Sequence, residues 1–162
     1  MPGKKSWREK LADSKDLPKV VALQGKAATK WGKGTMAIPA PIEVDRIMRS
    51  VPRGRILTTD VLRAFIAGKH GATIGCPLTT GIFAWIAANA AEEAAEAGAR
   101  KITPYWRTLK TGGELNPKFP GGIAAQKSKL KAEGHRIETR GKRFFVANYE
   151  AALFEPTAAA KS

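Results

Sequence analysis

Residues 59–97 read TDVLRAFIAGKHGATIGCPLTTGIFAWIAANAAEEAAEA, and this stretch decides the fold. Its first ten residues place apolar side chains at helical spacing behind Thr59 or Asp60, either of which can cap a helix. A loop rich in glycine and proline follows, and Thr79 or Thr80 can cap a second, longer helix. The stretch therefore predicts two helices joined by a turn.

The flanking sequence completes a mixed pattern of helices and strands. Pro41 and the acidic Glu43 begin a helix expected over residues 41–50. Residues 102–149 then predict a strand with a Gly-Gly turn, a short helix ended by Gly134, and a hairpin that turns at Arg140 and Gly141. This order is typical of a winged helix-turn-helix domain, in which one helix enters a groove of DNA and a hairpin flanks it. We expect an α+β fold with a C-terminal β-hairpin extension.

The charge of the chain points to a polyanionic partner. Its 162 residues carry 28 Lys and Arg against 14 Asp and Glu, a net charge of +14. The excess lies at the two ends, since residues 1–50 hold 11 basic and 5 acidic side chains and residues 101–162 hold 12 and 5. Double-stranded DNA is the expected partner, although charge alone does not distinguish DNA from RNA.

The chain divides into three expected parts. Residues 1–40 predict a basic N-terminal arm, partly ordered by a few apolar anchors, that either contacts DNA or serves as a solvated tail. Residues 41–155 form the winged helix domain. Residues 156–162 are rich in alanine and predict a disordered tail.

Several classes of protein are disfavoured by the composition. No apolar run approaches the length of a membrane span, and the charged N-terminus lacks a signal peptide, so we expect a cytoplasmic monomer that is nucleoid-associated if bacterial. One cysteine, Cys76, excludes an intramolecular disulfide. His70 and His135 lie far apart and are expected to be solvated, so neither a metal site nor a cofactor is predicted.

Four motifs carry a resemblance to a known family. They are VPRGRILTT at 51–59, TTGIFAWIAANA at 79–90, ITPYWRTLKTGGELNPKFPGG at 102–122 and QKSKLKAEG at 126–134. Together they resemble the C-terminal DNA-binding domain of the methylated-DNA cysteine methyltransferases and the related alkyltransferase-like proteins. The resemblance covers about half of the chain.

The resemblance implies a lesion pocket without its chemistry. The family takes an alkyl group from guanine with a Cys thiolate that is activated through His and Glu. Here Tyr105 stands at the Cys position, Trp106 at the His position and Glu133 at the Glu position. A phenol with a pKa near 10 is a poor nucleophile, so we expect no catalytic residue. Tyr105 and Trp106 either line a pocket for an extruded base or pack in the core.

The resemblance also implies a DNA-contacting surface. The tyrosine that assists nucleotide rotation in the family aligns with Thr59, and the arginine that fills the vacated stack aligns near Leu78, which could act as an apolar wedge. The small Gly81 and Ala84 would permit close approach of the helix to DNA. The full set of expected DNA-binding residues is Arg53, Arg55, Thr58, Thr59, Leu78, Thr79, Thr80, Gly81, Ala84, Arg107, Lys110 and Lys127.

These observations favour a non-catalytic DNA-binding protein of the alkyltransferase-like type that recognises alkylated or damaged guanine, with a repair protein as a further partner. One alternative is an architectural or regulatory DNA-binding protein that kept the scaffold and lost the pocket. The other is an alkyltransferase that uses Cys76, which lies close to the start of the long helix.

Overall fold

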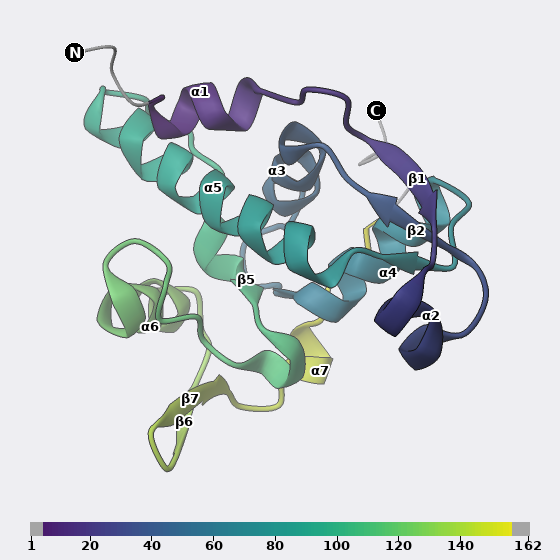
Figure 1. Cartoon of the computed structure of the whole chain (residues 1–162). Helices are drawn as coiled ribbons and strands as arrows, with labels where there is room; N and C mark the ends of the chain where they lie inside the picture. Colours follow the sequence, from purple (N-terminus) through teal and green to yellow (C-terminus); the bar gives the residue numbers. More distant parts are fainter. Residues whose placement is uncertain (1–4, 157–162) are drawn as a thin grey trace.

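The structure, a computed structural model, describes residues 5–156 as a mixed α+β fold (Figure 1). The helices are α1 (Trp7–Ala12), α2 (Gly25–Trp31), α3 (Pro41–Arg49), α4 (Thr59–Lys69), α5 (Pro77–Glu96), α6 (Gly122–Ala132) and α7 (Tyr149–Ala152). The strands are β1 (Lys19–Ala22), β2 (Thr35–Ile38), β3 (Leu57–Thr58), β4 (Ile74–Gly75), β5 (Thr108–Leu109), β6 (Ile137–Arg140) and β7 (Arg143–Val146). Among these helices, none is long and apolar enough to cross a membrane.

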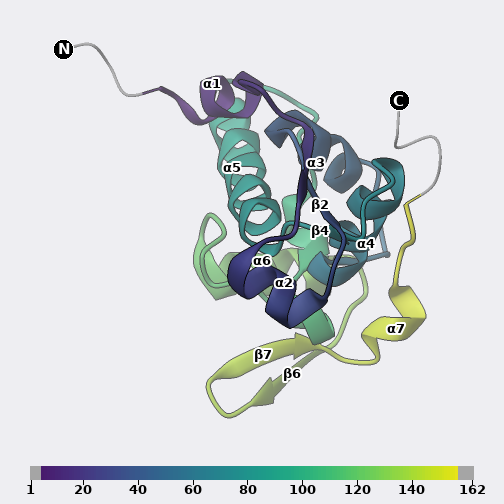
Figure 2. The same cartoon turned by 45° about the vertical axis from the view of Figure 1, so that its right-hand side comes forward.

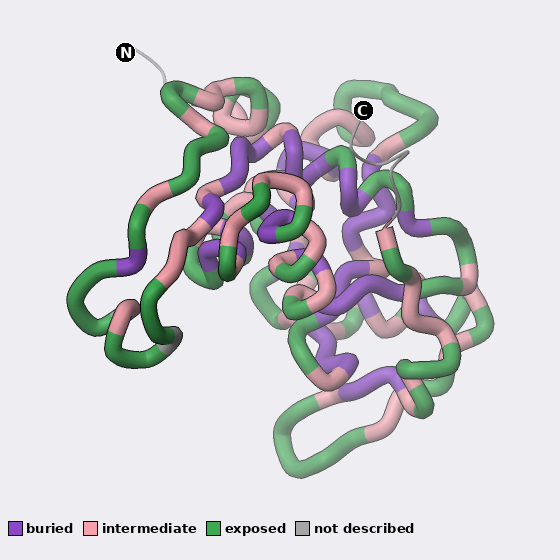
Figure 3. Tube along the Cα trace, turned by 90° about the vertical axis from the view of Figure 1, so that its right-hand side faces the viewer, coloured by how far each residue is buried: buried purple, intermediate pink, exposed green. Residues whose placement is uncertain are grey.

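Helix α5 is the centre of the core. One side of it is lined by small, fully buried alanines, including Ala84, Ala87 and Ala88. Small side chains allow neighbouring helices to approach closely, and α3 packs there through Ile47 and Met48, both wholly buried. The exposed segments lie mainly at the periphery (Figure 3). The core therefore fixes α5 along one face and leaves its other faces for contacts.

Residues 5–40 are built into the fold more completely than a partly ordered arm. Helix α1 lies along α5, where the Trp7 and Trp85 rings meet edge to face at 4.7 Å. Strand β1 pairs antiparallel with β2, and β2 pairs parallel with β4. This segment thus adds two strands to the short β4, which leads directly into α5. Residues 157–162, most of the expected disordered tail, lie outside the described residues.

A second cluster holds the C-terminal part of the fold. Strands β3 and β5 pair in parallel, and β6 and β7 form the expected antiparallel hairpin, with its turn one residue later, at Gly141 and Lys142. Ile56, Leu109 and Leu130 pack together behind these strands. The hairpin is therefore anchored at its base and projects from the body of the fold (Figure 1).

The helices predicted at 41–50, 59–68 and 123–133 are confirmed within one or two residues. The start of the long helix is corrected, because α5 begins at Pro77 with Cys76 as its N-cap. Proline is favoured at the first helical position, where the missing N–H group has no intrahelical acceptor. Thr79 and Thr80 consequently lie inside the helix, and their hydroxyls have no hydrogen-bond partner within the described part of the chain.

Gly75 allows β4 to pass against α4. A Cβ atom at this position would overlap the backbone carbonyl oxygen of Arg63. We expect Gly75→Ala to lower the free energy of unfolding by about 1–3 kcal/mol, because the backbone must move apart. Gly68→Ala is the matched control, since open space surrounds that helical glycine and alanine there should stabilise by about 0.5–1 kcal/mol. Denaturant unfolding of both variants measures the difference, and equal effects would contradict the close approach.

Candidate nucleic-acid interface

The N-terminal half of α5 presents an exposed apolar stripe. Leu78, Ile82 and Trp85 are 71%, 41% and 38% exposed. Their spacing of four and then three residues places them on one face of the helix. Gly81, which is exposed between them, adds no bulk. This end of α5 therefore offers an uncovered surface on which a partner can approach the helix closely.

Two adjoining hollows lie beside the start of α5. The first, of about 470 Å³, lies between the stripe and the segment with Asn116, Pro117 and Lys118. The second, of about 570 Å³, is lined by Arg63 and Arg143 among others. The two hollows have four lining residues in common, namely Pro77, Gly81, Lys110 and Asn116, so they adjoin each other.

A buried glutamine positions the segment between the hollows. The side chain of Gln126 is fully buried, accepts a hydrogen bond from the Asn116 backbone N–H at 2.8 Å, and donates to the carbonyl of Trp106 at 3.1 Å. These bonds fix the segment relative to η1 (Tyr105–Arg107), a turn of 3₁₀ helix. The rim of the hollows is therefore set by the core.

The hollows carry an excess of positive charge. Arg63, Lys110, Lys118 and Arg143 line them, and Glu114 is the one acidic lining residue among those described. Arg143 donates to both carboxylate oxygens of Glu114 at 2.7 and 3.0 Å, and these bonds lower the pKa of Glu114. The charge of Glu114 is thus compensated, and the surface around the start of α5 suits a phosphate backbone.

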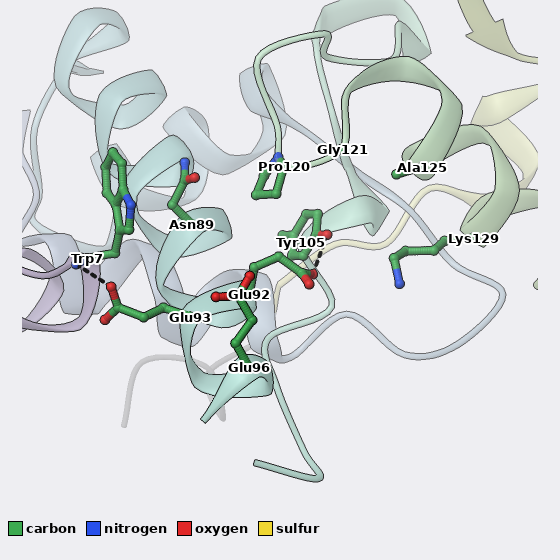
Figure 4. A pocket seen from close by; sticks show the side chains of 10 residues that line it. All are labelled: Trp7, Asn89, Glu92, Glu93, Glu96, Tyr105, Pro120, Gly121, Ala125 and Lys129. Carbon is green, nitrogen blue, oxygen red and sulfur yellow. Dashed lines mark hydrogen bonds between the residues drawn. The ribbon is translucent and has the colours of Figure 1, made fainter. Parts of the chain in front are cut away.

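The C-terminal half of α5 has the opposite character. A hollow of about 510 Å³ there is lined by Glu92, Glu93 and Glu96, with Lys129 as its basic residue among those described (Figure 4). Glu93 accepts hydrogen bonds from the backbone N–H groups of Trp7 and Arg8, both at 3.1 Å. These bonds tie α1 across the acidic end of α5. Phosphates would be repelled here, so the two ends of α5 differ in what they can bind.

Tyr105, which the resemblance aligns with an acceptor cysteine, is 1% exposed and lies in the core. Its ring packs edge to face against Trp106 and Phe119. The hydroxyl donates a hydrogen bond to Glu92 at 2.7 Å (Figure 4). Burial and this bond raise the pKa of the phenol well above its usual value. Tyr105 therefore combines the two predicted roles, because it packs in the core and also lines the hollow beside Glu92.

Trp106, Arg107 and Glu133 form a buried polar network. Arg107 donates to both carboxylate oxygens of Glu133, at 2.9 and 2.8 Å, and to the Val51 carbonyl at 2.7 Å. The Trp106 indole N–H donates to Glu133 at 2.9 Å. Burial opposes ionisation of Glu133, but the Arg107 and Trp106 hydrogen bonds outweigh it, so the pKa of Glu133 is lowered. Glu133 therefore anchors η1 to the end of α6.

Burial removes several residues from the predicted DNA-contact set. Thr58, Thr80 and Ala84 are 1%, 0% and 2% exposed. The hydroxyl of Thr79 is buried as well. Arg107 donates its hydrogen bonds to Glu133 and Val51. None of these side chains offers DNA a free polar group.

The remaining predicted residues divide into tethered and available groups. Arg55 donates to the carbonyls of Ala152 and Leu153, and thereby holds the C-terminal segment. Arg53 is exposed and donates to the carbonyl of Ala132, while Lys127 lies over the Phe144 ring. The available residues line the hollows beside the start of α5, and they are Thr59, Leu78, Gly81 and Lys110.

The cysteine and the histidines are also placed by the fold. Cys76 is buried at 7% exposure, and its backbone N–H donates to Ala37. The prediction of solvated histidines is wrong, because His70 bonds to the buried Glu43 at 2.7 Å and the Nε2 atom of His135 is buried. Within residues 5–156, no group of His, Cys, Asp or Glu could hold a metal ion.

Sequence reasoning missed five residues of the interface. Ile82 and Trp85 could have been found by extending the helical spacing from Leu78, since positions 78, 82 and 85 share a face. Arg63, Lys118 and Arg143 come from three separate segments. No local signal marks that their side chains converge at the start of α5.

Comparison with known proteins finds similarity to solved structures alone. No family model and no curated protein sequence matches the chain. The structure of S. pombe Atl1 in complex with damaged DNA containing O6-carboxymethylguanine aligns with 15% identity and a TM-score of 0.48. That of S. pombe ATL in complex with DNA aligns with 17% identity and a TM-score of 0.46. Each alignment covers 72% of this chain and 94% of the other.

Proposed function

We propose that this chain is a non-catalytic protein of the alkyltransferase-like type that binds double-stranded DNA through the start of α5. The observation that carries the proposal is the exposed stripe of Leu78, Ile82 and Trp85 beside two adjoining hollows with basic rims. In this proposal α4 and α5 act as the helix-turn-helix pair and the β6–β7 hairpin acts as the wing. Lys110 and Arg63 neutralise phosphates, and Leu78 faces the base edges.

The chemistry of the core supports binding without alkyl transfer. Tyr105 is 1% exposed and the raised pKa keeps its phenol protonated, which makes it a poor nucleophile toward an alkyl group. Cys76, the other candidate acceptor, is buried under the start of α5. The proposed reaction with DNA is therefore reversible binding.

Recognition of an alkylated guanine is the narrower form of this proposal. The hollow beside Ile82 and Trp85 supports this narrower proposal. It has a volume of about 470 Å³, and aromatic and aliphatic side chains form part of its lining next to Leu78. An unstacked base could be held there by apolar contact and stacking. In this proposal the base lies beside Ile82 and Trp85 rather than beside the buried Tyr105 and the half-buried Trp106.

Binding of a labelled duplex, followed by fluorescence anisotropy, tests the proposal. Each phosphate contact should change the slope of log affinity against log salt by about 0.9. We expect Arg63→Ala/Lys110→Ala to reduce the magnitude of this slope by about 2 and to weaken binding roughly tenfold per lost contact at 0.1 M salt. The matched control is Arg100→Ala/Lys101→Ala, which removes the same charge at the acidic end of α5.

Equal binding by the variant and the wild type would overturn the proposed interface. The same titration with one O6-methylguanine in the duplex separates the two forms of the proposal. A preference for the modified duplex that persists at near-physiological salt supports lesion recognition, because non-specific phosphate attraction is weak there. Equal affinity for both duplexes supports a general or architectural DNA-binding protein.

A further inference from the structure

The connection between β1 and β2 is basic and holds no acidic residue. Between residues 17 and 42 the sequence contains four lysines and no acidic residue. Lys26, Lys30 and Lys33 lie on or next to α2 and are exposed. The like charges of these lysines repel one another. A compact arrangement of the segment therefore needs stabilising contacts from elsewhere in the fold.

Strand pairing supplies those contacts, at the start of α5. Met36 and Ala37 of β2 pair with Ile74 and Gly75 of β4. One residue later, the N–H of Cys76, the N-cap of α5, donates to the Ala37 carbonyl at 2.8 Å. The connection therefore leaves the same point of the fold at which the exposed stripe of α5 begins.

Thr35 and Thr73 add hydrogen bonds at the other end of the β2–β4 pairing. The Thr35 N–H donates to the Thr73 hydroxyl at 3.0 Å, and the Thr73 N–H donates to the Thr35 hydroxyl at 3.2 Å. The backbones of the same two residues are also bonded, at 3.0 Å. The basic connection is thus held at its base by β-sheet bonds, so its position relative to α5 is set before any ligand arrives.

Figures 1 and 2 show where this connection lies. Helix α2 projects from the sheet beside the start of α5, and the β6–β7 hairpin projects from a different part of the fold (Figures 1 and 2). A duplex that contacts the start of α5 would pass next to α2. Prepositioned cations lose little conformational entropy when they bind phosphate, which favours a contact at this point.

We propose that residues 19–34 are a second DNA-contacting element, in which the lysines of the α2 connection bind phosphates next to those engaged at the start of α5. This inference rests on the proposed function, because it takes duplex DNA as the ligand. It extends the binding surface from the helix-turn-helix pair to the N-terminal segment, which gains a role beyond that of a solvated tail.

The test compares two variants that lose the same charge at different places. Lys26→Ala/Lys33→Ala removes two lysines of the connection, and Arg100→Ala/Lys101→Ala removes two exposed cations at the other end of α5. The probe is a labelled duplex of about two helical turns, titrated by anisotropy between about 50 and 200 mM salt. We expect the first variant to reduce the salt slope by nearly 2, whereas the second should leave it unchanged.

The outcomes separate this inference from the proposed function. If wild-type binding depends on salt and Lys26→Ala/Lys33→Ala behaves like the control, the lysines are solvated and the inference alone fails. If the wild type does not bind the duplex, the proposed function fails first. Circular dichroism of each variant verifies the fold, because the strands on either side of α2 pair through backbone bonds that the substitutions leave in place.

Discussion

Replacement of Arg107 by Ala should lower the free energy of unfolding by about 3–5 kcal/mol, because it leaves a buried carboxylate without its cation. The side chain of Glu133 is 4% exposed and that of Arg107 is 13% exposed. After the substitution, Glu133 keeps two neutral donors, the Trp106 indole N–H and the Gly54 backbone N–H, and no cation. Water cannot replace the guanidinium without opening the packing between η1 and α6.

Denaturant unfolding, followed by tryptophan fluorescence, measures this loss. Arg136→Ala is the matched control, since that arginine is exposed and its removal should change stability by no more than about 0.5 kcal/mol. A loss for Arg107→Ala as small as that of the control would show that solvent reaches Glu133 in the folded protein.

The same network makes the free energy of unfolding depend on pH in the acidic range. The pKa of Glu133 is lowered in the folded protein, so its stabilising contribution is complete above the ordinary value of 4.5 and is lost as pH falls through the folded pKa. Glu133→Gln should therefore be less stable than wild type at neutral pH. The difference in free energy of unfolding between the two proteins should shrink as the pH falls below the ordinary glutamate pKa of 4.5.

Local signals in the sequence predicted the helices well. Pro41 and the apolar spacing of Val44, Ile47 and Met48 define α3, and the same kind of spacing defines α4. The start of α5 was misplaced because Thr79 and Thr80 resemble caps, whereas Pro77 is the stronger signal of a first helical position. Propensity alone does not rank these competing signals.

The pairing of the N-terminal strands could not be predicted. β1 and β2 are four residues each, and β4 is two, so each is too short for its pattern to specify a partner. The parallel pairing of β2 with β4 joins residues nearly forty positions apart, and only tertiary packing determines it. This is why residues 1–40 were predicted as an arm.

The sequence proposes individual site residues but does not describe their surroundings. Leu78 and Lys110 line one hollow beside the start of α5, and their contact with DNA stays a prediction. The sequence could not show that the Phe119 ring would pack against Tyr105, or that Arg107 would donate its hydrogen bonds to Glu133. Burial of a polar side chain depends on residues that arrive from other segments, which local patterns do not contain.

Replacement of Tyr105 by Ala is expected to destabilise the protein by about 3–5 kcal/mol, the usual cost of deleting a large buried aromatic side chain. Its ring separates Trp106 from Phe119, and both contacts would be lost. Tyr105→Phe retains the ring and removes only the hydrogen bond to Glu92, so it should cost about 0.5–1.5 kcal/mol. Denaturant unfolding of the two variants measures both costs.

Alkaline pH provides a second, independent test of the buried phenol. The folded pKa of Tyr105 is raised, so its contribution is complete below the unfolded pKa and is lost as pH rises toward the folded one. The unfolded phenol ionises near pH 10, and each further pH unit should cost the wild type about 1.4 kcal/mol. Tyr105→Phe lacks this titration and should become the more stable protein at high pH. If wild type and Tyr105→Phe lose stability in parallel above pH 10, the phenol must be able to ionise in the folded protein, and its pKa is then not raised by burial.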